Sequence, residues 1–180
     1  MRKTLTTIFI ATFASIGAAQ AAPDANIPVA EALKSELARI GPESFTNPDF
    51  KPGTVHHVVL FRYKDGTTDA QRAEIRQRFV ALAKEAKRNR KPYIVSIETG
   101  RQASGEGVDR GFEEAFIVTF RSEGDRNYYV GTPIVTNPKF FDAAHQRFKE
   151  FVGPFLAQDN GVLVFDFAVE GRAEARQTVR

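Results

Sequence analysis

The stretch VHHVVLFRYKDG, residues 55–66, constrains the fold of this chain more than any other. Its β-branched and aromatic residues predict a strand over residues 55–63, followed by a tight turn. Successive strand side chains point to opposite faces. One face therefore carries His57, Val59, Phe61 and Tyr63, and the other His56, Val58, Leu60 and Arg62. Both faces hold large apolar residues, so we expect a central strand that is covered on both sides. An imidazole at its start marks where a pocket can begin.

The N-terminus predicts export. Arg2 and Lys3 precede the apolar run TLTTIFIATFASIGA, and Ala19-Gln20-Ala21 has the small-x-small pattern of a cleavage site. This order is typical of a secretory signal peptide, here residues 1–21, with cleavage after Ala21. A membrane anchor is disfavoured, because the run is short for a bilayer span and contains Thr and Ser. We expect a periplasmic or secreted protein that is not held in a membrane after cleavage.

The amino-acid composition excludes several classes of function. The chain of 180 residues has no cysteine, which excludes disulfides, thiol catalysis and zinc–thiolate sites. Without Arg2 and Lys3 the formal net charge of +3 falls to +1, so the mature chain lacks the basic character of a nucleic-acid-binding protein. We interpret the basic face of the helix after residue 68 as solvated surface.

Turn and capping residues divide the rest of the chain. A helix over 28–40 and a Pro- and Gly-containing linker or surface loop over 42–53 form an N-terminal extension, residues 22–53, which ends near Lys51. Thr68 and Gln71 predict a capping box for a helix that runs to about Arg88. The remaining predicted elements are strands at 93–99, 112–120 and 161–169, a short helix at 123–130, an aromatic-striped helix that begins at Asn137-Pro138, and a loose tail at 170–180.

The order β-α-β-β-α-β is that of an α+β, ferredoxin-like sandwich over residues 54–169. Helices on one face of the sheet leave the other uncovered, although it carries apolar residues from the strands. A monomer seldom exposes so large an apolar surface, so we expect a homodimer that packs sheet on sheet.

Five segments in this order resemble the stress-responsive dimeric α/β-barrel (Dabb) family, which includes a plant olivetolic acid cyclase. The segments are the strand at 55–66, SIETG at 96–100, FIVTF at 116–120, Tyr129 in the short helix and VLVFDF at 162–167. The resemblance covers residues 54–169 and implies a dimeric α/β barrel. This chain differs from the family pattern by an insertion of about ten residues, TPIVTNPKFF, at 132–141.

The resemblance also implies a set of pocket residues. In cyclase-like members two histidines and a tyrosine line the pocket, and these match His57, His145 and Tyr129 here. Such members close linear polyketides by aldol chemistry without a metal or cofactor, which implies no cofactor for this chain. His145 would be the general base, Tyr129 the donor to an enolate oxygen, and His57 an orienting partner.

Three further residues are candidates for contact with a small apolar or aromatic ligand: Phe61, Tyr63 and Asp142. Asp142 lies three residues before His145, so we expect it to pair with that ring and favour the charged imidazolium. A metal site is disfavoured because His56 and His57 point to opposite faces. Two alternatives stay open: a non-catalytic, stress-protective oligomer, and a haem-binding protein or cofactor-independent monooxygenase of the same fold.

Overall fold

The computed structural model describes residues 28–173. The predicted signal peptide and the end of the predicted tail lie outside these residues. In chain order the elements are α1 (Val29–Phe45), β1 (Pro52–Phe61), α2 (Asp69–Glu85), β2 (Lys87–Arg88), β3 (Lys91–Pro92), β4 (Ser96–Arg101), β5 (Glu114–Ser122), α3 (Glu123–Val130), the 3₁₀ turn η1 (Pro138–Phe140), α4 (Ala143–Val152), the 3₁₀ turn η2 (Gly153–Phe155) and β6 (Val162–Ala168). Among the residues described, no helix is long and apolar enough to cross a membrane.

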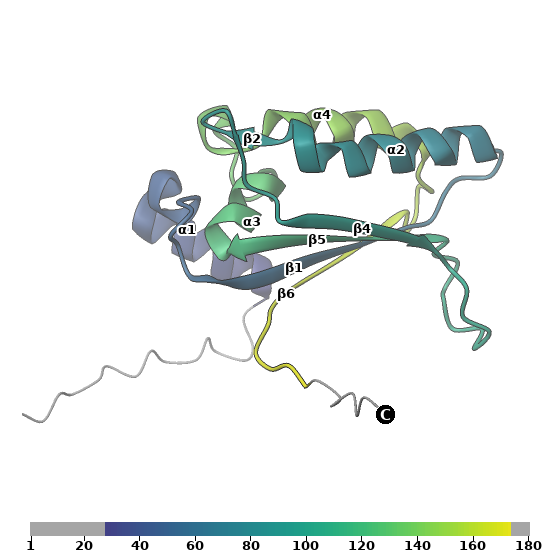
Figure 1. The fold of residues 1–180 in the computed structure, drawn as a ribbon, viewed down its shortest axis with the longest axis horizontal. Helices are drawn as coiled ribbons and strands as arrows, with labels where there is room; N and C mark the ends of the chain where they lie inside the picture. Colours follow the sequence, from purple (N-terminus) through teal and green to yellow (C-terminus); the bar gives the residue numbers. More distant parts are fainter. Residues whose placement is uncertain (1–27, 174–180) are drawn as a thin grey trace, which may run out of the picture.

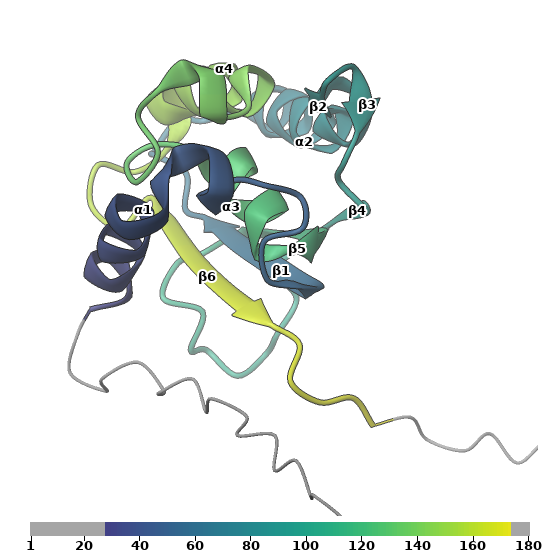
Figure 2. The ribbon, with the colours of Figure 1, turned by 90° about the vertical axis from the view of Figure 1, so that its left-hand side faces the viewer.

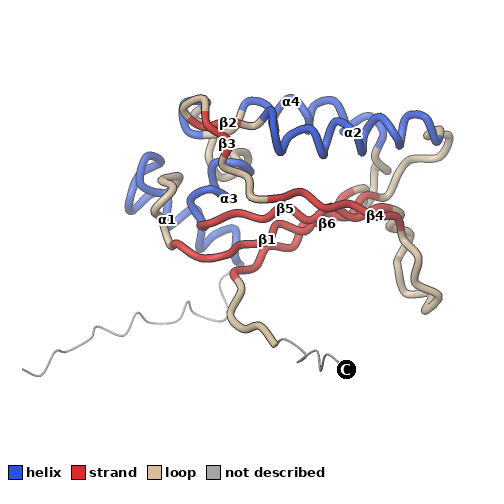
Figure 3. The backbone as a smooth tube through the Cα atoms, viewed as in Figure 1, coloured by secondary structure: helices blue, strands red, loops and turns tan. Residues whose placement is uncertain are grey.

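The four long strands form one antiparallel sheet in the order β4-β5-β1-β6 (Figure 3). The predicted α+β, ferredoxin-like fold is therefore confirmed, and β1 is central as expected. Its pairing places His57 opposite Val118 of β5 and opposite Asp166 of β6. The central strand thus brings residues from the two ends of the domain to the same point of the sheet.

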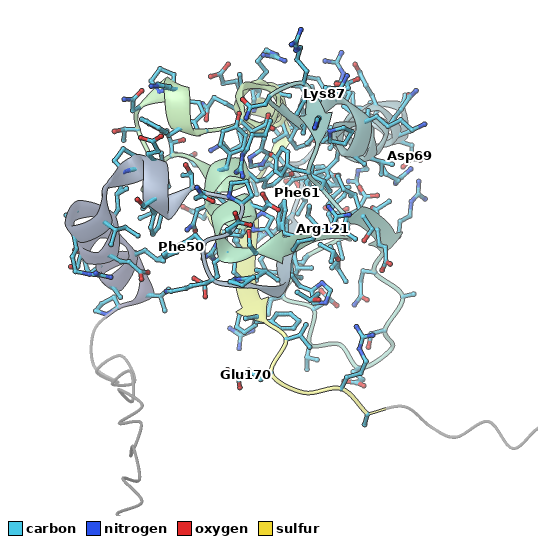
Figure 4. All side chains as sticks on the ribbon, turned by 60° about the vertical axis from the view of Figure 1, so that its left-hand side comes forward. Phe50, Phe61, Asp69, Lys87, Arg121 and Glu170 are labelled. Atoms are coloured by element: carbon cyan, nitrogen blue, oxygen red, sulfur yellow. The ribbon has the colours of Figure 1, made fainter. Side chains whose placement is uncertain are left out.

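Helices α2 and α4 lie side by side over one face of the sheet, and the space between these two layers holds the core (Figure 1). The capping box predicted for α2 is present: the Thr68 side chain accepts from the Gln71 backbone, and the Gln71 side chain accepts from the Thr68 backbone. Phe79 of α2 stacks on Phe116 of β5 with ring centroids 4.1 Å apart. In Figure 4, Phe61 lies in the interior of the domain, whereas Asp69 and Lys87 lie at its periphery.

The opposite face of the sheet is open within a single chain (Figure 1). The side chains on this face alternate with the buried ones, as the period of two requires. Its apolar members are Val58, Leu60, Ala115, Ile117, Leu163, Phe165 and Phe167. Phe165 is 62% exposed. The single chain therefore covers only one of the two faces of β1 that were expected to be covered.

Two predicted element boundaries are wrong. The strand predicted at 93–99 begins at Ser96, and a small hairpin of β2 and β3 precedes it. Tyr93 and Ile94 are nevertheless buried, which explains their strand-like apolar pattern. The helix predicted from Asn137-Pro138 is split into the turn η1 and the helix α4, because Asp142 caps a new helix after an extended Phe141.

The predicted surface loop over 42–53 is also wrong in part. Helix α1 does not stop at Gly41 but continues after a kink there, where Gly41 adopts a φ of 79° that favours glycine. Phe45 and Thr46 are buried, and α1 lies against α3 at one end of the sheet (Figure 2). The extension therefore packs closely on the domain.

Candidate functional site

A cavity of about 410 Å³ lies between the helix-facing side of the sheet and helices α2 and α4. Ligand pockets commonly measure roughly 300–1,000 Å³, so this cavity suits a small molecule. Its walls are mainly apolar, with a few polar tips. The lining residues are His57, Val59, Phe61, Phe79, Val130, Thr132, Pro133, His145, Phe148, Lys149, Val152, Leu156, Val162 and Val164.

His145 lies on the first turn of α4 and lines the cavity as a neutral imidazole. Its Nδ1 is 2.6 Å from the Tyr129 carbonyl oxygen. A carbonyl only accepts, so Nδ1 carries the proton and Nε2 holds the free electron pair. Burial, followed by the nearby His57, lowers the pKa of His145 to about 3. His145 is therefore unprotonated at Nε2 at neutral pH, the form in which it can take up a proton, although a pKa so far below neutral makes it a weak base.

Asp142 does not have the role predicted for it. Its Oδ1 accepts from the backbone nitrogens of Ala144 and His145, at 2.7 and 3.0 Å, and caps α4. Its Oδ2 accepts from the Tyr93 hydroxyl at 2.7 Å. Both oxygens are thus engaged away from the His145 ring, and Asp142 is not among the residues that line the cavity. The prediction that Asp142 favours a charged His145 is wrong.

His57 enters the cavity from β1 and is held by Asp166, which is partly buried and pairs with Arg126. Its Nδ1 lies 2.6 Å from Asp166 Oδ1, and Arg126 Nη1 donates to Asp166 Oδ2 at 2.7 Å. Burial alone would raise the pKa of Asp166, but the hydrogen bond and charge of His57, followed by those of Arg126, lower it. The carboxylate is therefore ionised at neutral pH and accepts the His57 Nδ1 proton. The His57 and His145 ring centroids are 6.5 Å apart.

Tyr129 lies behind the two histidines and does not line the cavity. Its ring stacks on His145 at a centroid distance of 3.7 Å and meets the His57 ring edge-on at 5.6 Å. Its hydroxyl is buried without a hydrogen-bond partner, and burial raises its pKa well above the ordinary value. The structure thus brings the three predicted residues together. The predicted donation from Tyr129 to an oxyanion stays a prediction, and it requires the hydroxyl to reach the cavity.

Of the two remaining candidates for ligand contact, Phe61 and Tyr63, only Phe61 lines the cavity. Phe61 lines the cavity wall as predicted for a ligand contact. Tyr63 points into a different cluster, where its hydroxyl donates to Glu114 Oε2 at 2.6 Å beside the ion pair of Arg76 with Glu114. Burial and Glu114 raise the pKa of this phenol. Tyr63 therefore stabilises the buried carboxylate and is not in the cavity wall. The predicted structural role of His56 agrees with its position on the open face, where Nδ1 meets Thr119 Oγ1 at 3.0 Å.

Sequence reasoning missed Asp166, Lys149 and Thr132. A single carboxylate in the apolar strand VLVFDF was a usable signal, because an acid in such a strand needs a partner. Lys149 Nζ donates to the carbonyls of Val130 and Thr132 and to Thr132 Oγ1, at 3.0, 3.1 and 3.0 Å. This lysine fixes the start of the predicted insertion, so that Thr132 and Pro133 form part of the cavity wall.

The fold and the site define a ferredoxin-like domain with a cavity between sheet and helices that two histidines enter. The chain belongs to the stress responsive A/B barrel domain family, whose model matches residues 55–169. No curated protein sequence matches the chain.

Three solved structures are similar to this chain. The protein At3g17210 from Arabidopsis thaliana is 23% identical, with a TM-score of 0.51 and coverage of 67% of this chain and 99% of that one. A hydroxynitrile lyase from Passiflora edulis is 20% identical, with a TM-score of 0.53 and coverage of 68% and 99%. A dimeric ferredoxin-like protein of unknown function from Jannaschia sp. CCS1 is 20% identical, with a TM-score of 0.49 and coverage of 65% and 100%.

The low pKa of His145 predicts an acid-sensitive fold. The pKa is about 3 in the folded chain and 6.5 ordinarily, so the unfolded state binds the extra proton between these values. The stabilisation is complete above pH 6.5 and is lost as pH falls toward 3. Between pH 7 and 4.5 the wild type should lose about 2–3 kcal/mol more free energy of unfolding than His145→Gln.

Urea unfolding of both proteins at pH 7 and 4.5 measures this difference. Asp166, whose stabilising contribution also decreases as pH falls, is present in both proteins and cancels in the comparison. Equal losses for the two proteins would contradict a neutral, buried His145.

Proposed function

We propose that this protein binds a small apolar or aromatic carbonyl compound in the cavity and transfers protons on it by general acid–base chemistry. The observation that carries the proposal is the state of His145: its Nδ1 is committed to a backbone carbonyl, and the ring lines an apolar cavity with Nε2 unprotonated. Such a base is fixed in position and already unprotonated, and the negative charge that forms on the ligand must offset the burial that lowers its pKa.

The proposed step is removal of a proton from the carbon next to the carbonyl. The electron pair of the C–H bond moves into the new C=C bond, and the carbonyl oxygen becomes an enolate oxygen. His145 Nε2 takes the proton. His57, held through Nδ1 by Asp166, faces the same cavity, and in its doubly protonated imidazolium form it would donate from Nε2 to the charged oxygen. An enolate formed there can add to a second carbonyl, as in cyclisation, and the reverse sequence is a lyase reaction.

Thermal-shift measurements test ligand binding. The panel contains phenols, linear aromatic polyketide analogues, aryl ketones and, because one fold neighbour is a hydroxynitrile lyase, hydroxynitriles. At least one class should raise the melting temperature of the wild type by several degrees at saturating concentration. If no class does so, the alternative of a non-catalytic protective assembly is favoured over ligand binding.

Deuterium exchange tests the chemistry. In D₂O the wild type should catalyse exchange of the α-hydrogens of a ketone that stabilises it, and His145→Ala should lower the rate by about 100-fold or more. His56→Ala, which changes the open face of the same strand, is the matched control and should keep the wild-type rate. Equal rates in His145→Ala and the wild type would exclude His145 as the base.

We also propose that the protein is a homodimer. The family description is a barrel, whereas one chain supplies a sheet of four strands, and small closed barrels need about eight. Packing the open faces of two chains together would bury the exposed apolar side chains of Leu163, Phe165 and Phe167. The same interface would cover the second face of β1.

Light scattering coupled to size exclusion tests the dimer. The wild type should have twice the chain mass at micromolar concentration. Phe165→Glu places a charge in the centre of the proposed interface and should yield monomers, because an unpaired buried charge is costly. Val29→Glu, at an exposed position of α1, should leave the dimer intact. A monomeric wild type would exclude the proposed interface.

Export completes the proposal. It rests on the order of charged, apolar and small residues in the first 21 positions. N-terminal sequencing of protein recovered from the periplasm of an expressing bacterium should begin at Ala22. Recovery of the intact chain in the cytoplasm would argue against export.

A further inference from the structure

The N-terminal extension contacts the machinery that holds His57, although it lies outside the family domain. The family model begins at residue 55, whereas α1 and the residues after it occupy 29–51. These residues pack on α3, the helix that carries Arg126. The extension is therefore a feature of this chain that the family match does not account for.

The extension caps the start of α3. The first N–H groups of a helix have no partner within it. In α3 the backbone nitrogens of Glu123 and Gly124 donate to the carbonyls of Lys51 and Phe50, both at 3.1 Å. The contact is so close that a Cβ atom on Gly124 would lie 1.8 Å from the Asn47 carbonyl oxygen. Residues 47–51 are thus fitted to α3 at a position that only glycine permits.

A chain of hydrogen bonds then runs from the extension to the cavity. Asn127 Nδ2 donates to the Phe45 carbonyl at 2.9 Å, and Asn127 Oδ1 accepts from Arg126 Nε at 3.0 Å. Arg126 donates in turn to Asp166, which accepts from His57. Phe45, Asn127, Arg126 and His57 are all buried. The two links through Asn127 are therefore shielded from water, where hydrogen bonds are strongest and a missing partner is most costly, whereas the two links to Asp166 are partly buried.

The side-chain amide of Asn127 is placed to fix the guanidinium. Arg126 presents a rigid, planar fork: Nη1 donates to Asp166, Nε donates to Asn127, and Nη2 lies 3.8 Å from Glu123 Oε2. Asn127 holds the Nε edge, and Asn127 is itself held by the carbonyl at the end of α1. Moving the end of α1 therefore moves the cation that orients Asp166.

We propose that the extension over residues 29–51 is a positioning element of the site, and that Asn127 is the positioning residue through which it orients Arg126, Asp166 and His57. The role assigned to His57 rests on the proposed function, but its orientation by the extension does not. The helix α1 would then act on the site through α3 rather than in an assembly.

Nuclear magnetic resonance of the full chain labelled with ¹⁵N-histidine tests the proposal. The chain has three histidines, so the ring signals can be assigned by single substitutions. The readout is the Nδ1–H signal of His57 in its hydrogen bond to Asp166. In Asn127→Ala this signal should shift upfield and exchange with solvent about tenfold faster, as expected for a weakened hydrogen bond. Gly124→Ala, which pushes residues 47–51 off α3, should act in the same direction.

Two controls separate this role from general destabilisation. The His56 ring, on the open face, should give an unchanged signal in both variants. Lys34→Ala removes an exposed ion pair with Glu31 on α1 and should leave the His57 signal as in the wild type. An unchanged His57 signal in folded Asn127→Ala would overturn the proposal. If Gly124→Ala does not fold, the His57 signal of Asn127→Ala alone tests the proposal. The readout needs no ligand, so a failed ligand screen would contradict the proposed function and leave this test unaffected.

Discussion

The antiparallel pairing of β1 with β6 determines the site. Its register sets His57 opposite Asp166 and Val59 opposite Val164, so an imidazole and its carboxylate partner meet on the helix-facing side above an apolar wall. A slip of one residue would move His57 to the open face and bring His56 inward. The slip would also expose Val55, Val59 and Phe61, which are buried. Burial of these apolar residues therefore fixes the register, and the register in turn fixes the position of the histidine.

The two cavity histidines have different environments, and the difference suits them to different roles. His145 is buried against Tyr129, with one backbone carbonyl as the partner of its ring, and burial, followed by the nearby His57, keeps it neutral. His57 instead donates through Nδ1 to the ionised Asp166. One imidazole thus offers an electron pair while the other is oriented by a carboxylate. Two titratable groups in unlike environments are a common arrangement for acid–base catalysis.

Most of the fold could be predicted from the sequence, because the turn and capping residues and the pattern of buried apolar residues indicated the same elements. The alternation in residues 55–63 predicted the inner face of β1, and Thr68 with Gln71 predicted the start of α2. The prediction for Asp142 was wrong because a residue three positions before His145 can either cap the helix or pair with the His145 ring. The spacing in the sequence does not distinguish these two roles. Asp166 and Arg126 were missed because their link to His57 depends on strand register and on α3. The packing of residues 42–51 depends on contacts far along the chain, which local composition does not reveal.

The most direct test of this account is the protonation of the His145 ring in the unliganded protein. The ¹⁵N chemical shifts of the two ring nitrogens at pH 7 distinguish a nitrogen that carries a proton from one that does not. We expect a protonated Nδ1, bonded to the Tyr129 carbonyl, and an unprotonated Nε2 whose shift stays constant down to about pH 4.5. A ring protonated on both nitrogens at pH 7, or a proton on Nε2 with Nδ1 bare, would contradict it.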